Sequence, residues 1–194
     1  GGRLIAVQLH SRGITMRRSV LVLIAVAFVA SLAAPAMADN SYIGVDGCKM
    51  CHKKEKTGDQ FGKWSAGPHA GAYATLATDA AKEAAAAAGI EGNPQEAAEC
   101  LKCHVTAAGV DAAMLDKKYK IEDGVGCESC HGAGSEYKSM KVMKDHEAAV
   151  AAGLAVISEE VCTACHNEAS PTFKGFDFAE YSAKIAHPIP AADE

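Results

Sequence analysis

The cysteine pattern is the feature of this sequence with the clearest chemistry. All eight cysteines lie in pairs separated by two residues, and a histidine directly follows each pair. The four motifs are Cys48-Lys49-Met50-Cys51-His52, Cys100-Leu101-Lys102-Cys103-His104, Cys127-Glu128-Ser129-Cys130-His131 and Cys162-Thr163-Ala164-Cys165-His166. Cys-x-x-Cys-His is the attachment sequence of c-type haem. At this spacing two thiols bond to one porphyrin, and the histidine binds its iron. The sequence therefore predicts four covalently bound haem c groups.

Paired cysteines have three other common uses. Disulfides, a zinc site and a thioredoxin-like motif all occur with even or paired cysteines. None of them requires a histidine after every second cysteine. Histidine makes up 8 of the 194 residues. Four such placements by chance therefore have a probability of about 3 in a million, which favours haem attachment.

The remaining histidines are candidate ligands on the other face of the irons. Besides the four motif histidines, the chain after residue 38 contains His69, His146 and His187. Each follows a motif by 15 to 21 residues. Three spare histidines beside four irons predict three irons with two histidine ligands each, and one without.

The second motif is the expected exception. No spare histidine lies between His104 and Cys127. The haem at His104 is therefore expected to be five-coordinate or to use a different sixth ligand. Met114, Met140 and Met143 are the available methionines, although methionine also commonly fills gaps in a core.

The N-terminal part of the chain has the pattern of an export signal. Met16-Arg17-Arg18 precedes an uncharged apolar stretch over 20–34, and Ala36-Met37-Ala38 is a small-x-small cleavage site. Residues 1–38 are therefore interpreted as an N-terminal extension and a cleaved signal peptide, with residues 1–15 upstream of a plausible start at Met16. Residues 39–194 are expected to form a single tetrahaem domain in the periplasm. The apolar stretch is short for a membrane span, so no stable membrane anchor is expected.

Charge and composition limit the functions of the part after residue 38. All four arginines lie before residue 39, which leaves 15 lysines against 24 acidic residues and a charge of −9. An acidic chain is a poor candidate for binding nucleic acid. Only ten aromatic residues remain there, so a core of large side chains would be thin. The haems are therefore expected to form the core.

Helices rather than strands are expected to position the motifs. A helix starting at Thr78 or Asp79 should run through Ala88. Others should start at Asn93 and at Ser158 and lead into the second and fourth motifs. A further helix is expected over 145–152, and no segment alternates as a strand would. The predicted fold class is mainly α with long loops, little β, and compact packing around several haems.

The sequence around the motifs is also distinctive. The segments concerned are Trp64-Ser65-Ala66-Gly67-Pro68-His69-Ala70-Gly71-Ala72-Tyr73, Gly126 to Gly134, Ser170-Pro171-Thr172-Phe173 after Cys165-His166-Asn167, and Ile185-Ala186-His187-Pro188. With the four motifs and three spare histidines, they resemble the tetrahaem cytochrome c-554 family over roughly residues 43–190.

The resemblance implies how each iron is ligated. It implies a helical fold with haems in close pairs, three of them ligated by two histidines and one five-coordinate. His146 would then ligate the first haem, His187 the third and His69 the fourth. The second haem would be open, and Pro171 and Phe173 would crowd its free face.

Two functions are compatible with such a chain. The favoured one is an exported carrier that moves electrons between periplasmic redox proteins through closely packed haems. The alternative is an enzyme that acts on nitric oxide, hydroxylamine or a similar small molecule at the open second haem. Such enzymes usually place cationic or acidic groups over the iron, and here only Lys102 and Lys120 are candidates, so an enzyme is less favoured. An extracellular haem filament would need more histidines than seven.

Overall fold

Short helices carry the haem motifs in the computed structural model, which describes residues 40–187. The first, second and third motifs end at the last residue of α2 (Val45–His52), α6 (Ala98–His104) and α7 (Cys127–His131). The fourth begins in α10 (Glu159–Thr163), and the turn that follows brings the backbone N–H of His166 to the carbonyl of Cys162 at 2.9 Å. Residues three apart share one face of a helix, so both thiols of a motif point the same way.

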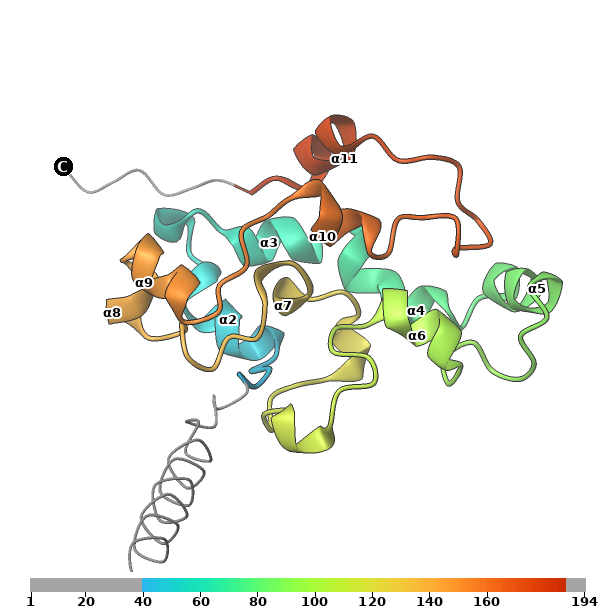
Figure 1. Ribbon diagram of the computed structural model, residues 1–194, viewed down its shortest axis with the longest axis horizontal. Coiled ribbons are helices and arrows are strands. Elements are labelled where there is room, and N and C mark those ends of the chain that lie inside the picture. The colour runs from blue at the N-terminus through green and yellow to red at the C-terminus, as the bar shows by residue number, and fades with distance from the viewer. Residues whose placement is uncertain (1–39, 188–194) are drawn as a thin grey trace, which may run out of the picture. The chain divides into compact units, whose positions relative to one another are not determined.

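The other elements are also short and joined by loops (Figure 1). They are η1 (Glu55–Thr57), α3 (Gln60–Ser65), η2 (Pro68–Gly71), α4 (Ala72–Thr75), α5 (Asp79–Ala87), η3 (Ala112–Met114), η4 (Ile121–Asp123), α8 (Met140–Met143), α9 (His146–Ala151) and α11 (Phe178–Ile185).

Among the described residues, β pairing is limited to one isolated bridge. Tyr42 and Leu115 form an isolated parallel bridge. The backbone N–H of Tyr42 donates to Met114 at 2.8 Å, and its carbonyl accepts from Asp116 at 2.8 Å. The prediction of a mainly α fold with little β is confirmed.

Local capping explains two of the helices that the sequence predicts correctly, α5 and α9. The Thr78 hydroxyl accepts from the backbone N–H of Ala81 at 3.2 Å and starts α5. The Asp145 carboxylate caps α9 in the same way, through Ala148 at 3.0 Å. Ser158 precedes α10, although its side chain makes no capping hydrogen bond. In each case the residue that starts the helix also has an extended backbone, as an N-cap requires.

The helix predicted to start at Asn93 instead begins at Ala98. The Asn93 side chain accepts from the backbone N–H of Gln95 at 3.1 Å, and its carbonyl accepts from Glu96 at 2.9 Å. These bonds close a single turn, because Ala97 is extended and interrupts the helical path. Asparagine stabilises such turns as readily as it caps helices, so the pattern indicated the right residue and the wrong element.

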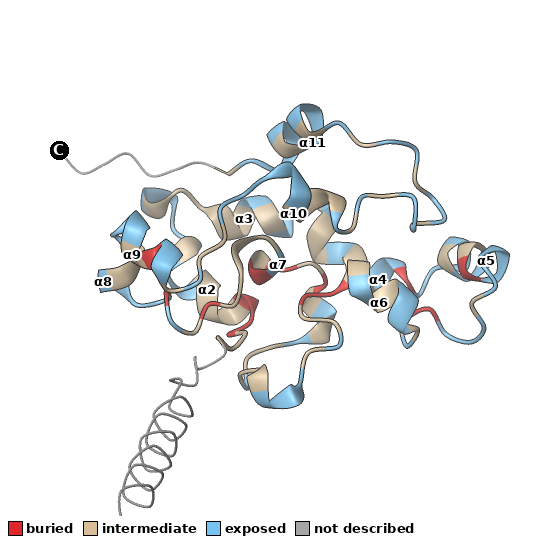
Figure 2. Ribbon diagram, in the orientation of Figure 1, coloured by how far each residue is buried: buried red, intermediate tan, exposed pale blue. Residues whose placement is uncertain are grey.

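Few large side chains form the core (Figure 2). The buried apolar residues are Ile43, Val45, Leu76, Ala85, Val105, Tyr137 and Ala149, with Pro94 also fully buried. They lie along several loops and helices rather than in one cluster. So small a core is compatible with the expectation that haems fill the interior, which stays a prediction.

Several expectations concern residues outside 40–187. The extension and signal peptide over 1–38 lie outside the described residues and stay predictions, as does the extent of the tetrahaem domain over 39–194. Within the described residues, no helix is both long and apolar enough to cross a bilayer.

Candidate haem-binding site

Two motif histidines have a hydrogen-bond partner behind the imidazole ring. The Nδ1 atom of His52 lies 3.1 Å from the side-chain oxygen of Gln60, and that of His104 lies 2.8 Å from the carbonyl of Ala72. An Nδ1–H that donates to such an acceptor leaves the Nε2 lone pair free for a metal. Both side chains are therefore held in the form that an iron requires.

The structure brings two spare histidines against motif histidines. The ring centres of His69 and His166 are 6.1 Å apart, and those of His131 and His187 are 5.9 Å apart. A metal held between two imidazoles separates their centres by about 6 Å, since each metal–nitrogen bond is about 2 Å long. Both pairs therefore fit an iron between the rings.

Burial keeps two of these imidazoles in the neutral form that binds metal. Burial lowers the pKa of His69, and the nearby His166 lowers it further. Burial likewise lowers the pKa of His131, with smaller contributions from His187 and His52. A metal ligand must be deprotonated, so both shifts favour ligation.

The other two motif histidines have no such partner among the ring contacts described for residues 40–187. His146 is exposed at the start of α9, and no contact between its ring and His52 is described. For His104 the contact described is the one with Ala72. The pairing of His146 with the first haem and the open position at the second haem stay predictions.

Thiols from different motifs lie next to one another. A hydrogen bond joins the Cys48 and Cys127 thiols and raises the pKa of Cys48. Burial raises the pKa of Cys165 to about 11, and the thiol of Cys103 contributes to this shift. Cys130 is close enough to Cys162 to feel its charge. These are the atoms that form the bonds to haem, so the sites follow one another in space as first, third, fourth and second.

Three segments fix the position of His69. Its carbonyl accepts from the backbone N–H of Val125 at 3.1 Å, and the Val125 carbonyl accepts from the indole N–H of Trp64 at 2.8 Å. Gly124 has φ +64, and a Cβ there would lie 2.9 Å from the carbonyl oxygen of His69. Only glycine allows this close approach without strain.

A buried carboxylate anchors the third motif. Glu128 is 4% exposed and accepts three backbone hydrogen bonds, from Ile43 at 2.8 Å, Gly44 at 2.9 Å and Gly134 at 2.7 Å. It thereby ties the segment before α2 and the loop after α7 to the third motif. Sequence reasoning did not predict this role, because glutamate is usually an exposed residue.

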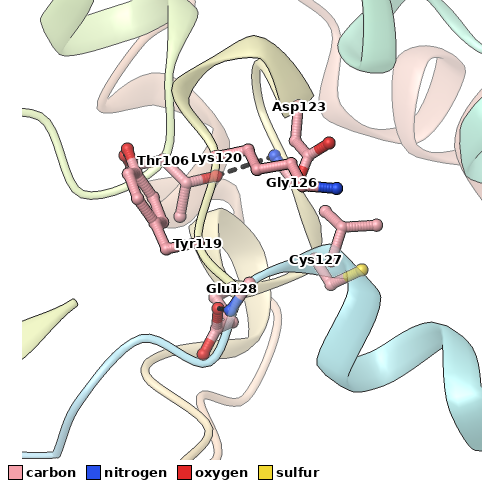
Figure 3. Close-up of a pocket in the computed structure, with 9 residues that line it drawn as sticks. Thr106, Tyr119, Lys120, Asp123, Gly126, Cys127 and Glu128 are labelled. Atoms are coloured by element: carbon pink, nitrogen blue, oxygen red, sulfur yellow. Dashed lines mark hydrogen bonds between the residues drawn. The ribbon is translucent and has the colours of Figure 1, made fainter. Parts of the chain in front are cut away.

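Hydroxyl and amide groups surround the same motif (Figure 3). Figure 3 shows Thr106 accepting from the backbone N–H of Gly126, at 2.8 Å, beside Cys127 and Glu128. The Thr106 hydroxyl also lies 2.8 Å from that of Ser129. Tyr119 donates to the carbonyl of Thr106. These hydrogen bonds hold the loop after the second motif against the third motif.

The fourth motif lies against aromatic side chains. Phe176 stacks on His166 with ring centres 4.9 Å apart, and Tyr181 follows at 5.2 Å from Phe176. Sequence reasoning named Pro171 and Phe173 in this region and missed Phe176. Pro171 is exposed and Phe173 half-buried, and their place beside the second iron stays a prediction.

The motifs and the fold together define a class of protein. Four Cys-x-x-Cys-His motifs that start in short helices of a mainly helical fold are typical of a c-type cytochrome, which binds haem covalently and transfers electrons.

Comparison with known proteins finds a similarity to one family within this class. Residues 47–132, which include the first three motifs, match the family described as cytochrome c554 and c-prime. Cytochrome c-554 of Nitrosomonas europaea is 31% identical over 104 residues, or 52% of this chain. The chain spans 42% of the length of that relative. No solved structure matches the chain. The resemblance to the cytochrome c-554 family is confirmed.

Proposed function

We propose that the chain is a periplasmic electron carrier with four haem c groups. The observation that carries the proposal is the adjacency of thiols from different motifs, from the first through the third and fourth to the second. Each bound haem supplies an iron that takes up and releases one electron. Neighbouring sites would give electrons a continuous path across the chain.

Ligation of the irons follows the arrangement of the histidines. His52, His104, His131 and His166 are the proposed ligands on the motif side. His69 is assigned to the fourth haem and His187 to the third, which is supported by the ring distances of 6.1 and 5.9 Å. His146 is assigned to the first haem on the family resemblance. Two strong ligands on one iron leave no position for a substrate, as suits a carrier.

Replacing His187 tests this assignment. His187→Ala is expected to convert one low-spin haem to the high-spin state while all haems stay covalently attached, because the third iron loses a ligand and the thioether bonds do not change. The visible spectrum and electron paramagnetic resonance measure the change. Ile185→Ala, in the same segment, is the control and should leave the spin states unaltered. An unchanged spectrum for His187→Ala would remove His187 from the ligands.

The second haem site is the basis of an alternative function. Among the described residues, His104 is contacted by the Ala72 carbonyl and by no second imidazole. An iron open at this position could bind nitric oxide or hydroxylamine, and the neighbouring haems would supply electrons. This second candidate is a redox enzyme for small nitrogen compounds, and it is compatible with electron carrying.

One experiment separates the two functions. Mass spectrometry of the exported protein should give four haems per chain. Electron paramagnetic resonance is then expected to show one high-spin haem in four, which nitric oxide binds after reduction. Turnover of the bound molecule would establish the enzyme, and binding without turnover would leave a carrier with one open iron. Four low-spin haems that bind no nitric oxide would contradict the open second haem.

A further inference from the structure

The first motif contains the most exposed of the motif cysteines. All eight motif cysteines lie in the described residues, and Cys51 alone among them is exposed. Its neighbour Met50 is 61% exposed. Electron transfer between proteins requires close approach to a cofactor, so an exposed attachment site at one end of the series of sites is where a partner can approach.

Lysines surround this exposed site. Lys49 lies in α2 with its ammonium 4.4 Å from the centre of the Phe61 ring, and Lys118 reaches Met50 with Nζ 3.6 Å from the sulfur. Lys53 and Lys54 follow the motif and are exposed. Here the first-motif face denotes Lys49, Met50, Cys51, Lys53, Lys54 and Lys118. It combines the exposed apolar side chain of Met50 with four lysines, and protein interfaces commonly join apolar and charged groups.

One acidic group beside this face, Asp46, is paired with a lysine. Asp46 accepts from the ammonium of Lys120 at 2.6 Å. That hydrogen bond, with the charges of Lys120, Lys49 and Lys118, lowers the pKa of Asp46. The negative charge of Asp46 therefore neutralises the charge of Lys120 more than the charges of the lysines on the first-motif face.

Charge is distributed unevenly between the two ends of the series of sites. Residues 49–63 carry five lysines and two acidic residues, whereas residues 79–111 carry two lysines and six acidic residues. Figure 1 shows α2, in the first segment, well separated from α5 and α6, in the second. At physiological salt, charges are screened beyond about 8 Å, so a docking partner senses the local charge rather than the net charge of −9.

We propose that the first-motif face is the docking surface for a redox protein whose own contact face is acidic. The proposal rests on the proposed function as an electron carrier and adds the charge of one partner and the haem that it contacts. Cationic and anionic faces orient two proteins before contact and raise their association rate. The acidic segment over 79–111 disfavours the opposite orientation, in which this partner would meet the second haem.

The test uses two small oxidants of opposite charge and one protein. Ferricyanide is the anionic oxidant and tris(phenanthroline)cobalt(III) the cationic one, and each accepts one electron from the reduced cytochrome. Stopped-flow spectroscopy gives the rate constants from low to high ionic strength. Flavodoxin hydroquinone, whose flavin lies in an acidic face, then serves as the protein reductant of the oxidised cytochrome, and one electron passes to the cytochrome as the semiquinone forms.

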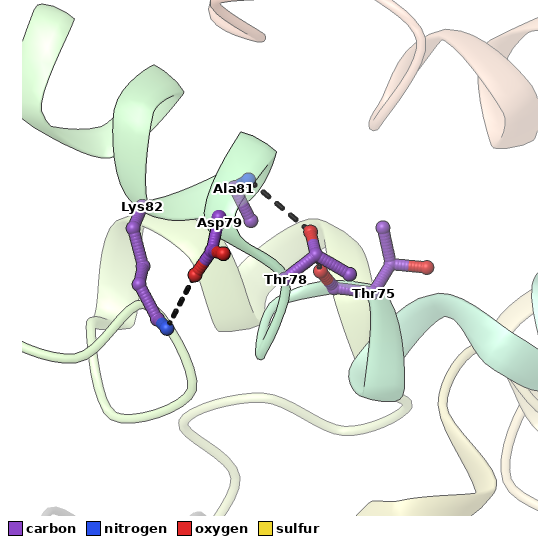
Figure 4. A network of polar contacts seen from close by, with 5 residues as sticks. All are labelled: Thr75, Thr78, Asp79, Ala81 and Lys82. Atoms are coloured by element: carbon purple, nitrogen blue, oxygen red, sulfur yellow. Dashed lines mark hydrogen bonds and ion pairs between the residues drawn. The ribbon is translucent and has the colours of Figure 1, made fainter.

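The variants change the same total charge at two places. Lys53→Glu with Lys54→Glu reverses charge on the first-motif face. Lys82→Glu with Lys174→Glu is the control, since both lysines are exposed and lie outside that face. Figure 4 shows Lys82 on α5, 2.9 Å from Asp79, a surface pair.

The first pair of substitutions is expected to lower the rate constants with ferricyanide and with flavodoxin about tenfold at low salt, and the difference should vanish at high salt. The control should change them less than twofold, and the cobalt complex should not be slowed by either pair. Equal effects of the two pairs, or none, would overturn the proposed face. If neither oxidant removes electrons from the reduced protein, the electron carrier itself is contradicted.

A second copy of the chain is the competing occupant, because its acidic segment could meet the first-motif face. Sedimentation velocity at low salt measures this directly. A monomer over the concentrations used is expected for a face that serves another protein. Self-association that Lys53→Glu with Lys54→Glu abolishes would assign the face to a second copy and overturn the proposal.

Discussion

Synthesised without haem attachment, the chain is expected to have no cooperative unfolding transition. Its buried apolar side chains are few, and two of the seven are alanines. Burial contributes about 25 cal/mol per Å² of apolar surface, and ordering each residue costs about 1.5 kcal/mol, so a core of this size cannot hold the fold alone. Covalently bound haems would supply the missing apolar surface.

The comparison is between the chain over 39–194 made in the cytoplasm and the same chain exported and loaded with haem. Circular dichroism during a urea titration should give a sigmoidal curve for the loaded form and a gradual drift for the other. The dispersion of amide signals in nuclear magnetic resonance spectra is an independent readout. A sharp transition of the haem-free chain, with dispersed signals, would contradict the view that haem forms the core.

Glu128→Ala is expected to lower the free energy of unfolding of the haem-loaded protein by about 3–5 kcal/mol, because each buried N–H left unpaired costs about 1–3 kcal/mol. Three such groups lose their acceptor, on Ile43, Gly44 and Gly134. Whole domains are stable by about 5–15 kcal/mol, so the loss would be a large fraction of the total. Urea unfolding followed by circular dichroism measures it.

Two further variants give this prediction its controls. Glu128→Gln keeps one carbonyl oxygen, which can still accept from Ile43 and Gly134, so it should cost less than the alanine substitution. Glu122→Ala removes an exposed carboxylate and should change the free energy of unfolding by no more than about 0.5 kcal/mol. If Glu128→Ala behaves like Glu122→Ala, the carboxylate does not anchor the third motif.

Features set by residues close in sequence could be predicted, and features set by distant residues could not. Thr78 and Asp145 start their helices with side chains that reach only three residues ahead, and both helices form where expected. The hydrogen bonds of Asn93 are equally local, but the same bonds occur in turns and in helix caps. The helix before the second motif was therefore predicted to start too early. The class of protein was accessible because one short motif contains both thiols and the first histidine that bind one haem.

The packing around the motifs depends on contacts that no local pattern reveals. Counting histidines indicates that three are spare, yet it does not indicate which ring lies against which. The stacking of Phe176 on His166 was missed because no local pattern marks which phenylalanine reaches that ring. Glu128 was missed for the same reason, since its partners at residues 43 and 44 are 85 and 84 positions away.

That separation has a consequence for how the protein matures. The segment that contains the first motif cannot reach its final place until Glu128 and the third motif are available, and the fourth motif is needed to complete the site at His69. Contacts between distant parts of a chain form late and slow its folding. In the proposed export from the N-terminus, the first part of the chain would therefore stay unfolded until the later motifs arrive. In that interval the enzymes that attach haem would have access to the motifs, and so would proteases and other thiols.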